Sequence, residues 1–224
     1  MTRDLAHRLP IVTVLVIASC AYTFAWQSDL VGLPQPIETW LAPCSRAAID
    51  AHLWHTTLSY AWLHMNWAHL IGNMSLMWAC AAPFETSCGH IRCAAAYLAG
   101  AVAGAFAFAV VREPNDPFML IGASGAVFSI VGAYAVALAK AHRSSALGSY
   151  ARQALSRSLA WVVRLVCINL VYGLFLAQGV SNMAHVGGLV TGALIAMLTI
   201  RSPRHPRRQQ VRPEDHMADP IRWP

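Results

Sequence analysis

The stretch Gly122-Ala123-Ser124-Gly125 stands in the middle of the chain, where an irregular loop becomes a long apolar run. Further along, the stretch Ala184-His185-Val186-Gly187-Gly188 opens a second apolar run. Polar groups are expensive in hydrocarbon, so a hydroxyl and an imidazole at the starts of two lipid-soluble segments need an explanation. Both side chains are therefore candidate functional residues.

These runs belong to a largely apolar chain. Of its 224 residues, 57% are hydrophobic and 12% are charged, whereas a soluble domain carries about 25% charged residues. Six windows are long enough for membrane helices of about 17–25 residues: Leu9–Trp26, Trp67–Phe84, Cys93–Val111, Phe118–Ala139, Ser158–Ala177 and Met183–Ile200. The sequence therefore predicts an all-α membrane protein, a multi-pass bundle of six transmembrane helices in one domain over residues 9–200.

The longest connection and the two ends of the chain complete this organisation. Residues 27–63 hold three prolines and three tryptophans, Pro34, Pro36, Pro43, Trp40, Trp54 and Trp62. Tryptophan favours the membrane–water interface, so we expect a first loop that is partly embedded in the membrane. Residues 1–8 are expected to form a short cytoplasmic N-terminus. Residues 201–224, rich in Arg and Pro, predict a basic, disordered cytoplasmic tail.

Basic residues indicate the orientation, because lysine and arginine gather in cytoplasmic connections. They occupy the N-terminus, the second and fourth connections and the tail: Arg3, Arg8, Arg92, Lys140, Arg143, Arg152, Arg157, Arg201, Arg204, Arg207, Arg208, Arg212 and Arg222. The remaining connections hold only Arg46 and Arg112, beside acidic residues. Both termini are therefore expected in the cytoplasm, and the net charge of +6 reflects topology rather than nucleic-acid binding. The arginines of the tail leave open a contact with anionic lipid headgroups.

The first window leaves a second interpretation open. Ile17-Ala18-Ser19-Cys20 resembles a lipoprotein cleavage site after a basic N-terminus. The apolar stretch continues to Trp26, which favours an uncleaved helix. Arg164, inside the fifth window, is expected either to snorkel to one face or to meet a polar partner in the bundle. The cysteines form no CxxC pair, which favours buried or free thiols over metal ligands or disulfides: Cys20, Cys44, Cys80, Cys88, Cys93 and Cys167.

Polar residues at the start of the second window are suited to hydrogen bonding at membrane depth. His69 and Asn73 are four residues apart and share one helical face. We expect them to face the interior of the bundle, because lipid does not tolerate them. His64 lies about one and a half turns earlier and is placed to hydrogen-bond the loop.

Together these residues fit nucleophilic catalysis. A Ser hydroxyl attacks poorly until a base takes its proton, and His185 is the candidate base for Ser124. Attack on a carbonyl places negative charge on its oxygen, for which His69, Asn73 and a backbone N–H are candidate donors. No acidic residue stands at a matching depth, so a Ser–His dyad is expected. Phe128, one turn after Ser124, is placed to stack on the imidazole.

Helix direction and small residues are expected to bring these groups together. Orientation alternates along a membrane bundle, so the second, fourth and sixth helices begin on the same, non-cytoplasmic side. Glycines three or four residues apart let helix backbones approach closely, as in Gly100 with Gly104, Gly122 with Gly125 and Gly188 with Gly192. Close packing of the fourth and sixth helices would place Ser124 near His185.

In this combination the chain resembles the rhomboid family of intramembrane serine proteases, of the bacterial type. The matching motifs are His64-x4-His69-x3-Asn73, Gly122-Ala123-Ser124-Gly125 and Ala184-His185-x2-Gly188-x3-Gly192, within about residues 50–200. Glu85 also fits a position where the family often has an acid. Trp54-His55 departs from the Trp-Arg that many relatives carry in the first loop, which predicts a different anchoring of that loop.

The resemblance implies a six-helix bundle with a water-filled cavity open to the outside, in the cytoplasmic membrane of a bacterium. Ser124 would be the nucleophile and His185 its base. His69 and Asn73 would stabilise the oxyanion. Six further residues would support them: His64, Gly122, Gly125, Phe128, Gly188 and Gly192. The substrate would be a transmembrane helix of another protein, cut near its outer end without a cofactor or a metal.

Two other functions stay open on the sequence. A catalytically inactive relative would bind transmembrane helices in the same cavity, and a serine-directed fluorophosphonate would then leave Ser124 unlabelled. A metal site or transporter would use His64, His69 and His185, and purified protein would then carry tightly bound metal. No carboxylate or thiol joins these histidines at ligand spacing, which disfavours the metal site.

Overall fold

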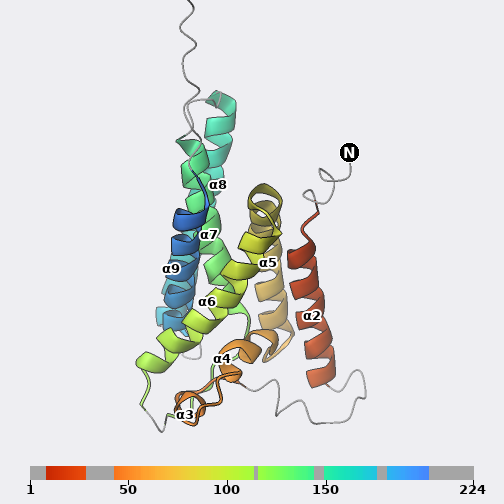
Figure 1. Ribbon diagram of the computed structural model, residues 1–224, viewed down its shortest axis with the longest axis vertical. Helices are drawn as coiled ribbons and strands as arrows, with labels where there is room; N and C mark the ends of the chain where they lie inside the picture. The colour runs from red at the N-terminus through yellow and green to blue at the C-terminus, as the bar shows by residue number, and fades with distance from the viewer. Residues whose placement is uncertain (1–8, 29–42, 114–115, 144–148, 176–180, 202–224) are drawn as a thin grey trace, which may run out of the picture.

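The structure is a computed structural model that describes residues 9–28, 43–113, 116–143, 149–175 and 181–201. In these ranges six long helices run along the bundle: α2 (Ile11–Gln27), α5 (Trp67–Cys88), α6 (His90–Val110), α7 (Ser124–His142), α8 (Ser149–Phe175) and α9 (Asn182–Thr199). Three short helices, α3 (Arg46–Asp50), α4 (Thr56–Ser59) and η2 (Tyr60–Trp62), belong to the first loop. Figure 1 shows α3 and α4 at one end of the bundle. The predicted all-α fold is confirmed.

Four of the six predicted windows agree with their helices to within a few residues, and two do not. The window from Phe118 begins too early, because α7 starts at Ser124. The backbone before it is non-helical: Leu120 pairs with Cys44 through N–H···O bonds of 3.0 and 2.6 Å. The window from Ser158 begins too late, because α8 starts at Ser149. The first turns of α8 are polar, so a search for apolar runs does not include them.

Several predictions fall outside the described residues. They concern residues 1–8, the tail from residue 202 onward and the residues Pro34, Pro36 and Trp40 of the first loop. Within the described ranges, α2 continues without a break through Cys20, whose side chain is buried. Arg164 is exposed on α8. Of the two expectations for Arg164, the interior partner is therefore wrong.

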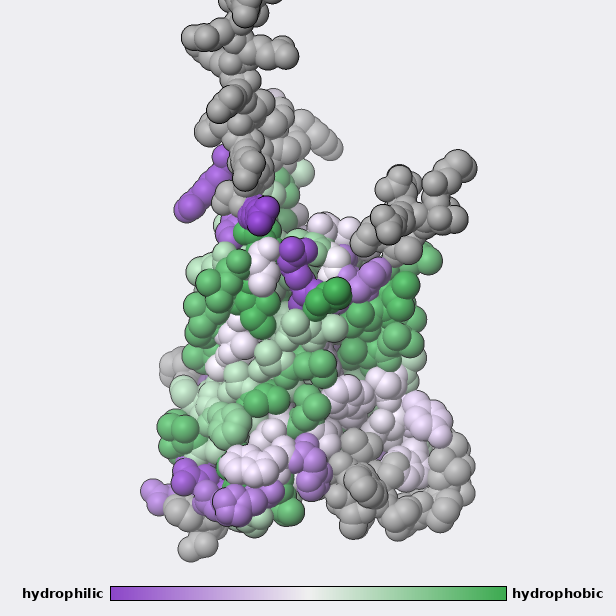
Figure 2. Space-filling view, in the orientation of Figure 1, coloured by the Kyte–Doolittle hydropathy of each residue, from purple (hydrophilic) through white to green (hydrophobic). Residues whose placement is uncertain are grey.

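Three of the described helices are apolar and long enough on their own to cross a membrane: α6, α7 and α9. The apolar helix α2 is shorter, with 17 residues. Polar residues interrupt the other two long helices. In α5 the buried Asn73 and Glu85 face the interior, whereas α8 carries arginines. Figure 2 shows apolar residues over the middle of one face of the bundle and hydrophilic residues toward both ends.

Glycines set the close approach of α7 and α9. A Cβ added at Gly192 would overlap the backbone carbonyl of Ser129, and a Cβ at Gly132 would overlap that of Leu189. A Cβ added at Gly100 would overlap the Ser129 side chain, so α6 also packs closely on α7. Backbones in such contact need residues without side chains. The predicted use of small residues for packing is thus visible at these positions.

The Gly192→Ala substitution should lower the free energy of unfolding by about 1–3 kcal/mol, because the added methyl group must push α9 away from α7. Gly72→Ala is the matched control, since a Cβ at Gly72 meets nothing within 4 Å. The midpoints of thermal unfolding in detergent micelles are measured for both variants. Equal midpoints for the two variants would contradict this packing.

A buried carboxylate attaches α2 to the end of α5. Glu85 is fully buried and accepts hydrogen bonds from the backbone N–H groups of Val12 and Thr13, at 2.7 and 2.8 Å, and from the Thr13 hydroxyl at 2.6 Å. His90 Nδ1 lies 2.5 Å from the same carboxylate. The first N–H groups of a helix lack intrahelical partners, so Glu85 caps α2 across the interface between the helices.

The Glu85→Ala substitution should therefore lower the free energy of unfolding by about 3 kcal/mol, because it leaves several buried donors without an acceptor. Glu113→Ala, at an exposed position after α6, is the control and should change little. Chemical denaturation in mixed micelles gives the comparison. A Glu85 variant as stable as the Glu113 variant would show that the cap contributes nothing.

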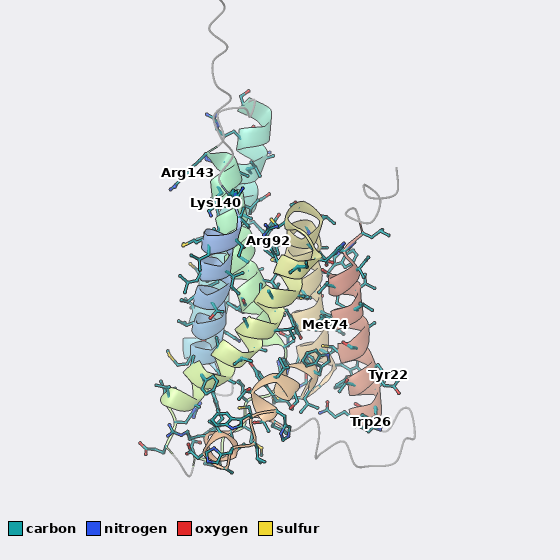
Figure 3. All side chains as sticks on the ribbon, in the orientation of Figure 1. Tyr22, Trp26, Met74, Arg92, Lys140 and Arg143 are labelled. Atoms are coloured by element: carbon teal, nitrogen blue, oxygen red, sulfur yellow. The ribbon has the colours of Figure 1, made fainter. Side chains whose placement is uncertain are left out.

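Two basic side chains cap the C-terminal end of α9. Lys140 Nζ donates to three carbonyl oxygens at the end of α9, those of Ala196, Met197 and Ile200, at 3.1, 2.7 and 2.5 Å. Arg92 donates to the Thr199 carbonyl at 3.1 Å. Figure 3 shows Arg92, Lys140 and Arg143 at the end of the bundle opposite Trp26. The described basic residues of the second and fourth connections thus share one end of the molecule.

Candidate active site

A pocket of about 560 Å³ lies where α5, α7 and α9 begin. Its lining includes all four residues expected to carry chemistry: His69 and Asn73 from α5, Ser124 from α7 and His185 from α9. Phe128 and Gly72 also line it. Residues far apart in the sequence thus share one cavity, at the end of the bundle away from Lys140 and Arg92.

Ser124 is the first residue of α7, directly after a turn that only glycine fits. Gly122 has a φ of +113°, which L side chains rarely adopt. A Cβ at this position would also lie 2.6 Å from His69 Nε2. The Gly122 N–H donates to the Tyr60 carbonyl at 3.0 Å, so the first loop holds the turn in place. Ser124 consequently stands at a helix N-terminus, where backbone N–H groups are unpaired and favour negative charge.

His185 lies in the first turn of α9 and is 5% exposed. Ser181 caps this helix, its hydroxyl accepting from the Ala184 N–H at 3.4 Å. The imidazole stacks on Phe128 with ring centroids 4.3 Å apart and planes 2° from parallel. Among the described residues, His185 Nδ1 is buried without a hydrogen-bond partner, and no hydrogen bond joins its ring to Ser124. The ring is therefore held by packing.

The helices α7 and α9 are also in close contact just beyond these two residues. A Cβ added at Gly188 would overlap the carbonyl oxygen of Gly125. Gly188 follows His185 by three positions and Gly125 follows Ser124 by one, so backbone contact fixes the two helix starts against each other. Gly125 itself leaves no free space, since a Cβ there would lie 3.0 Å from the Tyr60 hydroxyl oxygen.

His69 and Asn73 present donors beside the turn at Gly122. The Asn66 side chain caps α5 by accepting from the His69 N–H at 2.9 Å. The Met65 N–H donates to His69 Nδ1 at 3.5 Å, and a neutral imidazole that accepts at Nδ1 carries its proton on Nε2. Asn73 Nδ2 is buried without a partner in the described part of the chain. Both donors are thus available to a ligand in the pocket.

His64 lies behind His69 and does not line the pocket. Its ring is fully buried, with its centroid 5.3 Å from that of His69. Gln27 holds the His64 backbone through two hydrogen bonds of 3.1 and 3.2 Å. Burial, and then the neighbouring His69, lower the pKa of His64 to about 4. It is therefore neutral at pH 7 and serves as packing support.

The first loop is anchored by a residue that the sequence analysis did not single out. Arg46 pairs with Asp50 at 2.9 Å and donates to the Ala109 carbonyl at the end of α6 at 3.3 Å. Trp54, by contrast, is half exposed and its ring centroid lies 6.3 Å from that of Phe106. The i,i+4 spacing of Arg46 and Asp50 is the signal that points to this anchor. Within the described ranges, His, Cys, Asp and Glu form no group of three that could hold a metal ion.

Comparison with known proteins identifies the family. The sequence matches the Rhomboid domain over residues 51–202. The chain belongs to the rhomboid family. It is 30% identical over 148 residues to RHOMBOID-like protein 4 of Arabidopsis thaliana, a match that covers 66% of this chain and 34% of that protein.

Two further rhomboid relatives are named as proteases. Rhomboid protease GluP of Bacillus subtilis is 29% identical over 143 residues, which are 64% of this chain and 25% of GluP. Rhomboid-like protease 5 of Toxoplasma gondii is 30% identical over 144 residues, which are 62% of this chain and 16% of that protein. The matched regions thus span between 16% and 34% of the length of these three relatives. The family and the apolar helices indicate an integral membrane protein.

Proposed function

We propose that this rhomboid protein is an intramembrane serine endopeptidase that uses Ser124 and His185 as a catalytic dyad. The observation that carries the proposal is the shared pocket, in which a hydroxyl, an imidazole and two hydrogen-bond donors meet at one end of the bundle. Nucleophile, base and oxyanion donors are the parts that acyl transfer needs.

In the proposed reaction, His185 takes the proton of the Ser124 hydroxyl as its oxygen attacks the carbonyl carbon of the scissile peptide bond. The carbon–nitrogen bond then breaks, and the leaving amine receives the proton from His185. Water attacks the resulting ester, again with His185 as base, and releases the new carboxylate and the free enzyme. Phe128 keeps the imidazole plane fixed throughout by stacking at 4.3 Å.

The negative charge that forms on the carbonyl oxygen requires fixed donors. His69 Nε2–H, the Asn73 amide and the unpaired backbone N–H at the start of α7 would supply them. Because the Met65 N–H donates to Nδ1 of His69, the His69 ring needs no proton transfer before it donates. Gly122 provides the space for this ring, and His64 packs behind it.

The substrates would be transmembrane helices of other proteins, cut near their outer ends. Basic residues at the end of the bundle opposite the pocket support this orientation, with the pocket outside and both termini in the cytoplasm. A bacterial cytoplasmic membrane is the proposed location, residues 9–200 forming the membrane domain and 201–224 the basic tail. The chemistry needs no cofactor, no metal and no nucleic acid, and its surroundings are membrane lipids.

Co-expression with a panel of tagged single-span membrane proteins tests the function. The wild-type protein should release the outer fragment of at least one panel member into the medium or periplasm, and the Ser124→Ala variant should release none. Binding of uncleaved panel members, equally by the wild type and the variant, would instead indicate the inactive helix-binding protein.

A further inference from the structure

Among the described residues that line the active-site pocket, Arg112 is the one with a permanent charge. It follows the end of α6, where its N–H donates to the Ala109 carbonyl at 3.2 Å. The other charged residues near it, Asp116 and Glu113, do not line the pocket. The proposed nucleophile and oxyanion donors do not require a cation in the pocket wall. The position of Arg112 therefore needs a separate explanation.

Arg112 is held rigidly for a side chain near the surface. Its guanidinium carbon lies 5.0 Å from the ring centroid of Phe108 and 4.8 Å from that of Phe118. Arg112 Nη1 donates to Asp116 at 3.1 Å, and the Asp116 carboxylate also accepts from the Phe118 N–H at 2.9 Å. The Phe118 N–H, and then Arg112, lower the pKa of Asp116. Two rings and one carboxylate therefore fix the guanidinium plane before any substrate binds.

Part of this guanidinium is left without a partner. In the described structure Arg112 Nε is buried and makes no hydrogen bond, which is costly for a donor on a charged group. The side chain as a whole is 27% exposed and lines the same cavity as Ser124. An arginine offers five donors in a fixed fork that suits a carboxylate, and Asp116 occupies only one of them in the described contacts.

From these contacts we infer that Arg112 is a specificity residue: it receives an acidic side chain of the substrate, Asp or Glu, close to the cleaved bond. The inference rests on the proposed protease function, because it assigns a substrate preference to that same pocket. Beside Arg112 the pocket wall contains the apolar side chains Phe108, Phe118 and Met119. Because Asp116 engages one of its five donors, the guanidinium keeps donors for a substrate carboxylate, and a charge-assisted hydrogen bond beside apolar rings is stronger than one in open water.

A charge scan of a cleaved substrate tests this inference. Asp and its neutral isostere Asn are placed in turn at each position near the scissile bond, and the initial rates of cleavage are compared. For the wild-type protein, Asp should be cleaved about tenfold faster than Asn at one position. The Arg112→Gln variant should lose this ratio, so that it cleaves the Asp and Asn substrates at similar rates. Arg112→Lys should keep part of the ratio.

Arg46→Gln is the matched control, since Arg46 pairs with Asp50 at the same end of the molecule but does not line the pocket. It should keep the full preference for Asp. A wild-type protein that cleaves Asp and Asn substrates equally at every position would overturn the inference while leaving the protease function intact. So would an Arg112→Gln variant that slows both substrates by the same factor. A wild-type protein that cleaves no substrate would remove the protease function and the inference with it.

Discussion

Replacing Ser124 with alanine should lower the rate of substrate cleavage by more than about a thousandfold. The variant lacks the hydroxyl oxygen that Ser124 presents to the pocket at the start of α7, and water alone has no equivalent position. His185→Ala should lower the rate by a similar factor, because a Ser hydroxyl is a weak nucleophile without a base. Removing both should cost little more than removing one, since the two groups act as a unit.

Matched controls separate chemistry from folding in this experiment. Ser75 is exposed on α5 and His55 is exposed before α4, so Ser75→Ala and His55→Ala should cleave at the wild-type rate. Unfolding temperatures of all variants should agree within a few degrees. A Ser124→Ala variant that still releases the outer fragment at the wild-type rate would exclude Ser124 as the nucleophile.

The His69→Ala and Asn73→Ala substitutions should each lower kcat by about 10²–10³-fold, with little change in KM. Each variant loses one donor that stands next to Gly122 and faces the pocket, and the charge that the donor stabilises exists only after attack on the carbonyl. Rates measured on a fluorogenic peptide with purified protein in micelles give kcat and KM separately.

His142→Ala is the control for these two variants. His142 lies at the other end of α7, where its Nε2 lies 2.9 Å from the Ser156 hydroxyl oxygen, and its loss should leave kcat unchanged. A His69→Ala variant that raises KM but keeps kcat would show that His69 binds the substrate and does not stabilise the oxyanion.

The number of long helices, the positions of most of them and four residues of the pocket, His69, Asn73, Ser124 and His185, could be predicted from sequence. Apolar windows located the helices because burial in lipid demands long apolar runs. The pocket residues could be grouped because helix direction alternates and because glycines at 125 and 188 permit close contact, which the structure shows at the carbonyl of Gly125.

Other features depend on contacts between segments that lie far apart along the chain. The apolar segment 118–123 predicts that α7 starts at Phe118, yet pairing with Cys44 keeps Leu120 extended. The start of α8 was missed because its first turns are polar. From sequence alone, Arg46 and Arg112 are only charges that bear on topology. Their roles depend on the Ala109 carbonyl and on the rings of Phe108 and Phe118, which no single stretch of sequence reveals.

Labelling with a fluorophosphonate probe tests most directly whether Ser124 and His185 act together. The purified protein in micelles is treated with the probe, digested and analysed by mass spectrometry. We predict one adduct, on Ser124, that is absent in Ser124→Ala and strongly reduced in His185→Ala. A wild-type protein that stays unlabelled, or a His185→Ala variant that is labelled on Ser124 at the wild-type rate, would contradict the proposed dyad.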